Sequence, residues 1–100
     1  TFFRDAKSQC EETFAICQTH GWTRIALVGE GDLADIAHLV ALGTGLELTL
    51  IAMNGDFKSF DAVLVTDVND PQGVYNALHA KVEYHRLMTL PLLHISKVIQ

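Results

Sequence analysis

Cysteine is scarce in this sequence, which excludes a disulfide-rich scaffold. The 100 residues contain two cysteines, Cys10 and Cys17. If both lie on one helix they share a face, but they are separated by roughly 10 Å along its axis, and a disulfide needs Cα atoms within about 7 Å. We therefore expect two small buried side chains in a reducing compartment, and hence a cytoplasmic protein.

Basic residues are also few. Seven Lys and Arg are outnumbered by twelve Asp and Glu, which gives a formal net charge of −5. The basic residues are scattered along the sequence and form no run typical of a nucleic-acid-binding surface. We expect no direct contact between this chain and nucleic acid.

Long apolar runs are missing, although 49% of the residues are hydrophobic. The longest uncharged apolar segment is far too short to span a bilayer, and no signal peptide is evident, so we expect a soluble protein without a membrane partner. Length and composition fit one domain over residues 1–100. The first residue is Thr1 rather than methionine, which predicts a fragment of a longer or processed chain.

Residues 24–34 are the stretch around which the predicted fold is organised. The apolar run at 24–28 is typical of a strand buried on both faces of a parallel sheet. Gly29 and Gly31 allow a sharp turn, and Asp32 can cap the helix that follows. The pattern is the G-x-G-x-x-A form of the dinucleotide-binding fingerprint.

Helical and strand patterns alternate along the rest of the chain. An apolar stripe at helical spacing predicts a helix over residues 2–19, formed by Phe3, Ala6, Cys10, Phe14 and Cys17. Other patterns predict a helix over 32–42, strands over 46–53, 61–66 and 92–96, and a helix from Pro71 to about His85. Asp70 before Pro71 is a strong start signal for that last helix, which is expected to bury Val74, Ala77, Leu78 and Val82.

Short connections between these elements indicate a parallel sheet. Because no helix pattern follows the second strand, we predict that the third strand returns beside the first, in the order 2-1-3-4. The expected fold is a Rossmann-like three-layer α/β domain with an extra N-terminal helix. Ligands of such sheets bind at the crevice between the carboxyl ends of strands one and three. The predicted lining is Gly29, Glu30, Gly31, Asp32, Asn54, Thr66 and Asp67.

Two features of the glycine turn disfavour a dinucleotide, although NAD or NADP stays possible. Dinucleotide binders usually carry an acid at the end of the second strand, where this chain has Asn54. Glu30, Asp32 and Asp35 surround the helix N-terminus at which a pyrophosphate would lie, and the turn holds no Lys or Arg. A different small ligand, or a turn that binds nothing, remains open.

No catalytic or metal-binding constellation stands out. The histidines have no partners at ligand spacing, and neither cysteine has a visible base. Asp67 and Ser96 are placed like the phosphoacceptor and hydroxyl residue of bacterial receiver domains, but the acidic pair of that family is missing after the first strand. We expect no enzyme activity and no metal, and we expect Asp67 to cap a turn.

Three stretches carry a family resemblance, at residues 6–14, at 25–36, and at 60–66 with 70–71 and 74–75. In these stretches the chain resembles the Rossmann-like C-terminal domain that follows a winged-helix, MarR-type DNA-binding domain in some bacterial transcriptional regulators. The resemblance implies a sensory or scaffolding module without an assigned reaction. Asn54 departs from the aspartate often found at that position in such domains.

We therefore predict an effector-sensing or dimerisation domain of a transcriptional regulator whose DNA-binding domain is absent from this chain. Phe2, Phe3 and Phe14 of the first helix are the predicted coupling element and homodimer contact, and the crevice is the predicted site of a small-molecule effector. Two alternatives stay open. One is a small NAD(P)- or nucleotide-binding domain of an oxidoreductase, and the other is a purely structural dimerisation domain.

Overall fold

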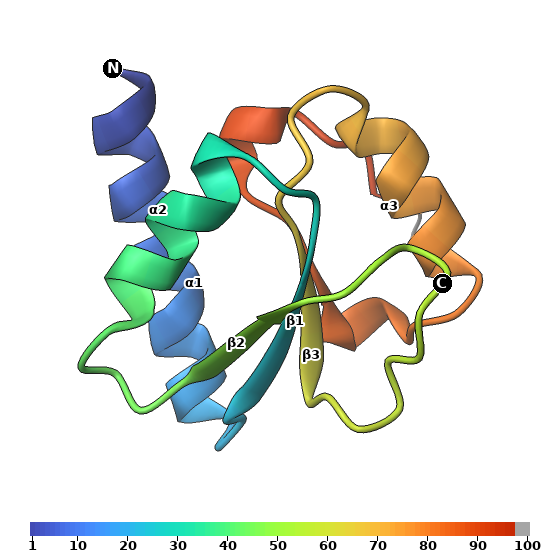
Figure 1. The fold of residues 1–100 in the computed structure, drawn as a ribbon, viewed down its shortest axis with the longest axis horizontal. Coiled ribbons are helices and arrows are strands. Elements are labelled where there is room, and N and C mark those ends of the chain that lie inside the picture. The colour runs from blue at the N-terminus through green and yellow to red at the C-terminus, as the bar shows by residue number, and fades with distance from the viewer. Residues whose placement is uncertain (98–100) are drawn as a thin grey trace.

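The computed structural model describes residues 1–97 and has three layers (Figure 1). A four-stranded parallel sheet in the order β2-β1-β3-β4 forms the middle layer, as predicted. Helices α1 (Phe2–Thr19) and α2 (Asp32–Ala41) cover one face, and α3 (Pro71–His79) covers the other. The strands are β1 (Arg24–Val28), β2 (Glu47–Leu50), β3 (Ala62–Val65) and β4 (Leu87–Met88). Two 3-10 turns, Tyr84–Arg86 and Pro91–Leu93, flank β4.

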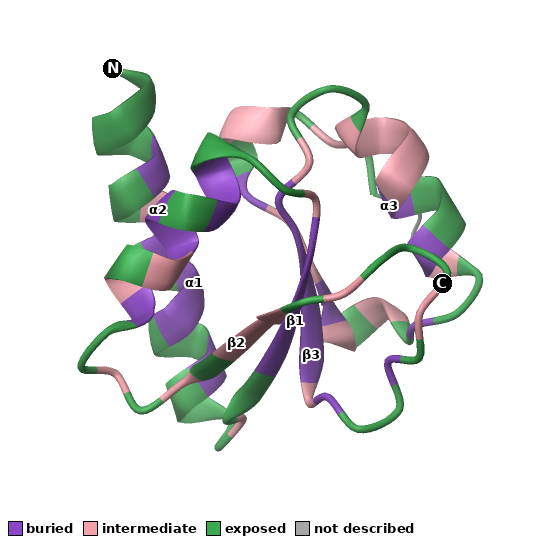
Figure 2. Ribbon diagram, in the orientation of Figure 1, coloured by how far each residue is buried: buried purple, intermediate pink, exposed green. Residues whose placement is uncertain are grey.

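The central strands supply two separate cores because alternate side chains point to opposite faces of the sheet. Ile25 and Leu27 pack with α1 and α2, whereas Ala26 and Val28 pack with α3 and with the loop before β3. Figure 2 shows β1 and β3 buried in the centre and β2 more exposed at the edge. Burial on both faces explains why the central strands are continuous apolar runs.

Asp61 holds the amino ends of β1 and β3 together. Its carboxylate accepts hydrogen bonds from the backbone N–H groups of Arg24 at 3.0 Å and Thr23 at 2.8 Å, and these bonds lower the pKa of Asp61. Arg86 donates to the carbonyl oxygens of Asp61 and Phe60 from the segment that leads into β4. The loop before β3 is therefore tied to both neighbouring strands.

The predicted end of the third helix is wrong. Helix α3 ends at His79 rather than near His85, and Ala77 is exposed. Val82 lies in a turn whose backbone N–H donates to Leu78 at 2.9 Å, and its side chain still reaches the second core. The helical spacing of apolar residues continues past the end of α3 because Val82, a turn residue, packs in the same core as the helix.

The predicted bounds of two strands are also wrong. The fourth strand is Leu87–Met88 and not residues 92–96, where the chain forms a 3-10 turn beside α1. There the Leu92 backbone N–H donates to Gln9 Oε1 at 2.8 Å, so this apolar stretch packs against a helix instead of pairing with a strand. Strand β2 ends at Leu50, three residues before the predicted end.

Both thiols lie on the buried face of α1, as predicted. Burial raises the pKa of Cys10 and of Cys17 to about 11, which keeps both thiols protonated and unreactive at neutral pH. Cys17 Sγ lies 3.5 Å from Met88 Sδ of β4. The two cysteines act as small core side chains.

Tyr75 carries a polar group into the second core and leads to a stability prediction. Its side chain is fully buried, and its hydroxyl has no hydrogen-bond partner among residues 1–97. Burying an unpaired hydroxyl costs about 1–3 kcal/mol. We expect Tyr75→Phe to leave the free energy of unfolding in urea unchanged or to raise it by about 1 kcal/mol. Tyr84→Phe, at a partly exposed site, serves as the control, and a clear loss of stability only in Tyr75→Phe would contradict the prediction.

Candidate functional site

The glycine turn joins β1 to α2 at the carboxyl edge of the sheet, as predicted. Gly29 and Gly31 have φ angles of 124° and 127°, which L side chains rarely adopt. The helix cap differs from the prediction. Gly31 is the N-cap residue and Asp32 is the first helical residue, so α2 begins without a side-chain cap. The first backbone N–H groups of α2 therefore receive no capping side chain.

Gly29 also allows the ends of β1 and β3 to approach each other closely. A Cβ atom at this position would lie 2.1 Å from the backbone nitrogen of Asp67. Next to this contact, Thr66 Oγ1 donates a hydrogen bond to the Gly29 carbonyl at 2.6 Å. The protein chain itself thus closes the space between β1 and β3, where the crevice was predicted.

Thr66 is therefore wrong as a ligand-lining residue, because its side chain is fully buried and bound to Gly29. Asp67 is half-buried, and its Oδ2 accepts the backbone N–H of Asp70 at 2.6 Å. This confirms the predicted turn cap. Asp70 Oδ1 in turn accepts the Gly73 N–H at 3.2 Å and caps α3, also as predicted.

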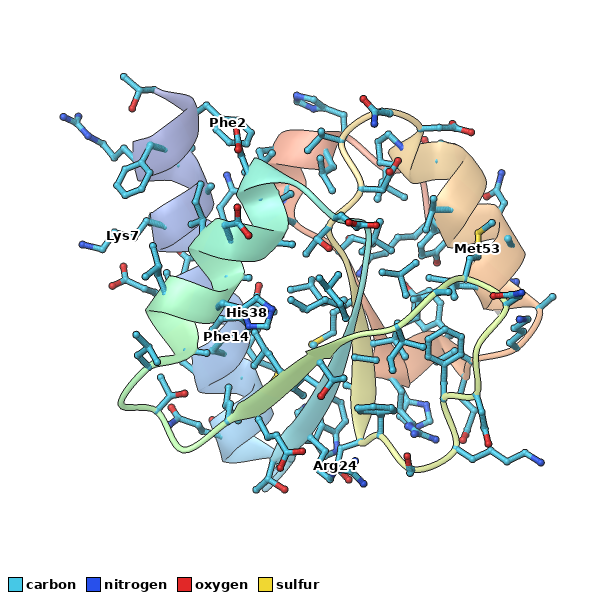
Figure 3. The ribbon with its side chains drawn as sticks, viewed as in Figure 1. Phe2, Lys7, Phe14, Arg24, His38 and Met53 are labelled. Atoms are coloured by element: carbon cyan, nitrogen blue, oxygen red, sulfur yellow. The ribbon has the colours of Figure 1, made fainter. Side chains whose placement is uncertain are left out.

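A crevice of about 500 Å³ lies beside the glycine turn, bounded by β1, the end of β2 and α3. It is lined by Val28, Gly29, Glu30, Leu50, Ile51, Ala52, Met53, Asp67 and Val74. Most of these side chains are apolar, and the charged groups among them are two carboxylates. Met53, labelled in Figure 3, lies in the loop that follows β2.

Only part of the predicted lining comes together in this crevice. Gly29, Glu30 and Asp67 contribute to it, whereas Gly31 and Asp32 lie outside its lining. Asn54 is exposed in the turn beyond β2 and does not line the crevice either.

The lining residues that the sequence analysis missed are Val28, Val74 and residues 50–53. Residues 50–53 were assigned to a strand, but β2 ends at Leu50, and beyond it the Ile51 N–H donates to the Leu27 carbonyl of β1 at 2.9 Å. The available signal was length, since the predicted second strand was eight residues long beside a predicted first strand of five.

The charges around the crevice do not fit the diphosphate of a dinucleotide. Glu30, Asp32 and Asp35 are all exposed around the start of α2. Among the described residues that line the crevice, none is Lys or Arg. Carboxylates at a helix start compete with a bound phosphate for the positive end of the helix. The site favours an uncharged or positively charged ligand instead.

Within residues 1–97, no three His, Cys, Asp or Glu side chains come together in a way that could hold a metal ion. In the same range, no helix combines the length and the apolar character needed to cross a membrane.

The three phenylalanines of α1 fall into two groups. Phe14 is 1% exposed and packs in the first core, so its side chain lies away from the surface that Phe2 and Phe3 share. Phe2 and Phe3 are 47% and 58% exposed on the amino-terminal turn, which projects past α2 (Figure 1). Together with Ile36 and Leu39 of α2 they line a shallow apolar hollow, which we call the phenylalanine hollow.

Comparisons with known proteins add no assignment to these surfaces. No family model, no curated protein and no solved structure matches the chain. The similarity to the C-terminal domains of MarR-type regulators stays a prediction.

The two glycines of the turn provide a matched pair of substitutions. Both have a φ angle that costs a non-glycine residue about 1–3 kcal/mol, but only Gly29 has neighbouring atoms within 4 Å of the added Cβ. We expect Gly29→Ala to lower the free energy of unfolding by about 1–3 kcal/mol more than Gly31→Ala does, because the overlap with Asp67 is added to the backbone strain. Urea unfolding of both variants measures the difference, and equal losses would contradict the close approach.

Proposed function

We propose that this chain is a regulatory α/β domain that binds a small effector and catalyses no reaction. The observation that carries the proposal is the crevice beside the glycine turn, outside the carboxyl ends of the strands, which is the edge at which parallel α/β sheets bind ligands. It lies toward the end of β2, because the Gly29–Asp67 contact closes the space between β1 and β3. Its volume of about 500 Å³ suits a small organic molecule.

The lining indicates the chemistry of the effector. Apolar side chains from residues 50–53 and from Val74 favour a hydrophobic body. The carboxylates of Glu30 and Asp67 favour an amine or another hydrogen-bond donor and disfavour an anion. An apolar amine is the ligand class that fits both features.

The position of α2 supports a signalling role. Glu30 lines the crevice, while Asp32 and Asp35 line the phenylalanine hollow. The first turn of α2 therefore lies between the two surfaces, and an effector that contacts Glu30 acts on the helix that forms one wall of the hollow. The resemblance to the C-terminal domains of transcriptional regulators supports the same role, and the unpaired buried thiols support a reducing, cytoplasmic setting.

The ligand class is tested with three probes of the same size, phenethylamine, 2-phenylethanol and phenylacetate. We expect phenethylamine to bind most tightly and phenylacetate most weakly, because the rim of the crevice carries two carboxylates. A ligand at 100 times its Kd adds about 2.7 kcal/mol to stability, so a thermal-shift series ranks the three.

Two controls accompany this series. Ala52→Trp fills the crevice and should abolish the shift with phenethylamine, whereas Ala80→Trp, at an exposed site outside the crevice lining, should not. Stronger stabilisation by phenylacetate, or by NAD or NADP, would refute the proposed ligand class.

Homodimerisation is a second candidate function, and the phenylalanine hollow favours it. Phe2, Phe3 and Leu39 are large apolar side chains that are exposed on one surface of α1 and α2. Lys7 borders one part of this surface and Asp35 another, so a twofold pairing can bring opposite charges of two copies together. A second copy of this chain is the partner that such a self-complementary surface fits.

We expect sedimentation to show a dimer whose Kd rises at least about tenfold in Phe3→Asp, since a buried unpaired charge at an apolar contact is costly. Val68→Asp changes another exposed apolar residue, after β3, and should leave the Kd unchanged. A monomeric wild type, or equal effects of the two substitutions, would rule out this contact.

A further inference from the structure

A second pocket, of about 280 Å³, lies next to the crevice along the same loop. Its walls come from residues 55–58 of the loop between β2 and β3 and from Lys81, Val82 and Arg86. Phe57 and Val82 provide a buried apolar floor. The pocket is separate from the glycine turn, which contributes no residue to it.

Positive charge is concentrated in this pocket. Lys58, Lys81 and Arg86 line it, which is three of the seven basic residues of a chain with a net charge of −5. Asp56 also lines the pocket, but its Oδ1 accepts the backbone N–H of Lys58 at 2.9 Å and is therefore partly engaged. The charged residues of the crevice are carboxylates, whereas this pocket has three cations and one carboxylate.

Lys81 is held in place by the loop. Its Nζ donates a hydrogen bond to the Met53 carbonyl at 2.8 Å and lies 5.8 Å from the centre of the Phe57 ring. An ammonium group has three donors, so two remain available to a ligand. Fixing the side chain in advance lowers the entropy cost of binding.

Arg86 is held as well. Its guanidinium donates to the carbonyl oxygens of Asp61 and Phe60, and Nη1 lies 3.5 Å from Glu83 Oε1. Carbonyl oxygens carry no net charge. Two carboxylates interact with the guanidinium, that of exposed Glu83 and that of Asp61, whose pKa Arg86 helps to lower, and near the surface such pairs are weak. Arg86 keeps part of its donor capacity.

Lys58 is the cation without a structural role. Its side chain is exposed and makes no hydrogen bond or ion pair with any residue in the part of the chain that the structure describes. Lys81 and Arg86 are held by the fold, and Lys58 is free to move toward a ligand. Together the three side chains provide a site for an anion.

We propose that this pocket binds a phosphate group, either as free inorganic phosphate or as a small phosphate monoester. The three cations that line the pocket favour a doubly charged anion over a singly charged carboxylate. The apolar floor of Phe57 and Val82 lies beneath the cations and can contact the organic part of a monoester. This site is independent of the crevice and of its proposed effector.

The test is an NMR titration with inorganic phosphate and with phenyl phosphate at constant ionic strength. We expect saturable shifts of the amide signals of Phe57, Lys58 and Val82 with a Kd in the millimolar range. Tighter binding of phenyl phosphate identifies a monoester as the ligand, and equal binding of the two identifies the free ion.

Lys58→Met and Lys81→Met should each raise the Kd for phosphate at least fivefold. Lys7→Met is the matched control, because Lys7 lies on α1, on the opposite side of the molecule from Met53 (Figure 3), and it should leave the Kd unchanged. Lys58→Met removes no contact of the fold, so its effect reports on the site even if Lys81→Met perturbs the loop.

Non-saturating shifts, or the same weakening in Lys7→Met as in Lys58→Met, would overturn the proposal by showing general charge attraction. Binding of phenethylamine to Lys58→Met tests the proposed effector site separately. The Kd for phenethylamine should be the same in this variant as in the wild type, whether or not the phosphate site exists.

Discussion

The close contact between Gly29 and Asp67 is the constraint on which the rest of the site depends. β1 and β3 pair in register with Val28 beside Val65, so the residues that follow the two strands meet at the same edge. Only glycine can occupy position 29, because any Cβ there would overlap the Asp67 backbone, and the Thr66 hydroxyl locks the contact. The contact closes the space between β1 and β3, and the crevice beside it lies toward the end of β2.

The remaining wall of the crevice is formed by a loop and not by a helix. The connection from β2 to β3 contains no helix, and it covers the sheet by burying Phe57 and Phe60 in the second core. Because the loop must cross from one edge of β1 to the other, it runs past the crevice and then past the basic pocket. Both hollows are thus consequences of one connection, and the Lys81–Met53 hydrogen bond joins them.

The sequence predicted the strand order and the glycine turn because these depend on local patterns, namely apolar runs, turn residues and helix starts. It misplaced features that depend on contacts between distant segments. Val82 kept a helical spacing after α3 had ended. Residues 92–96 were apolar because Leu92 and Leu93 pack in the first core beside α1, whereas Ile95 packs in the second core. Thr66 was misread for the same reason, since only the pairing of β1 with β3 brings its hydroxyl to Gly29.

The grouping of charged residues also depends on contacts between distant segments, so the sequence did not predict it. Lys58, Lys81 and Arg86 are spread over almost thirty positions of the sequence and were judged scattered, yet the fold brings them to one pocket. Glu30 and Asp67 are even further apart in sequence, and both line the crevice. A single lysine contacts the loop that both hollows share, since Lys81 lines one and binds the Met53 carbonyl of the other.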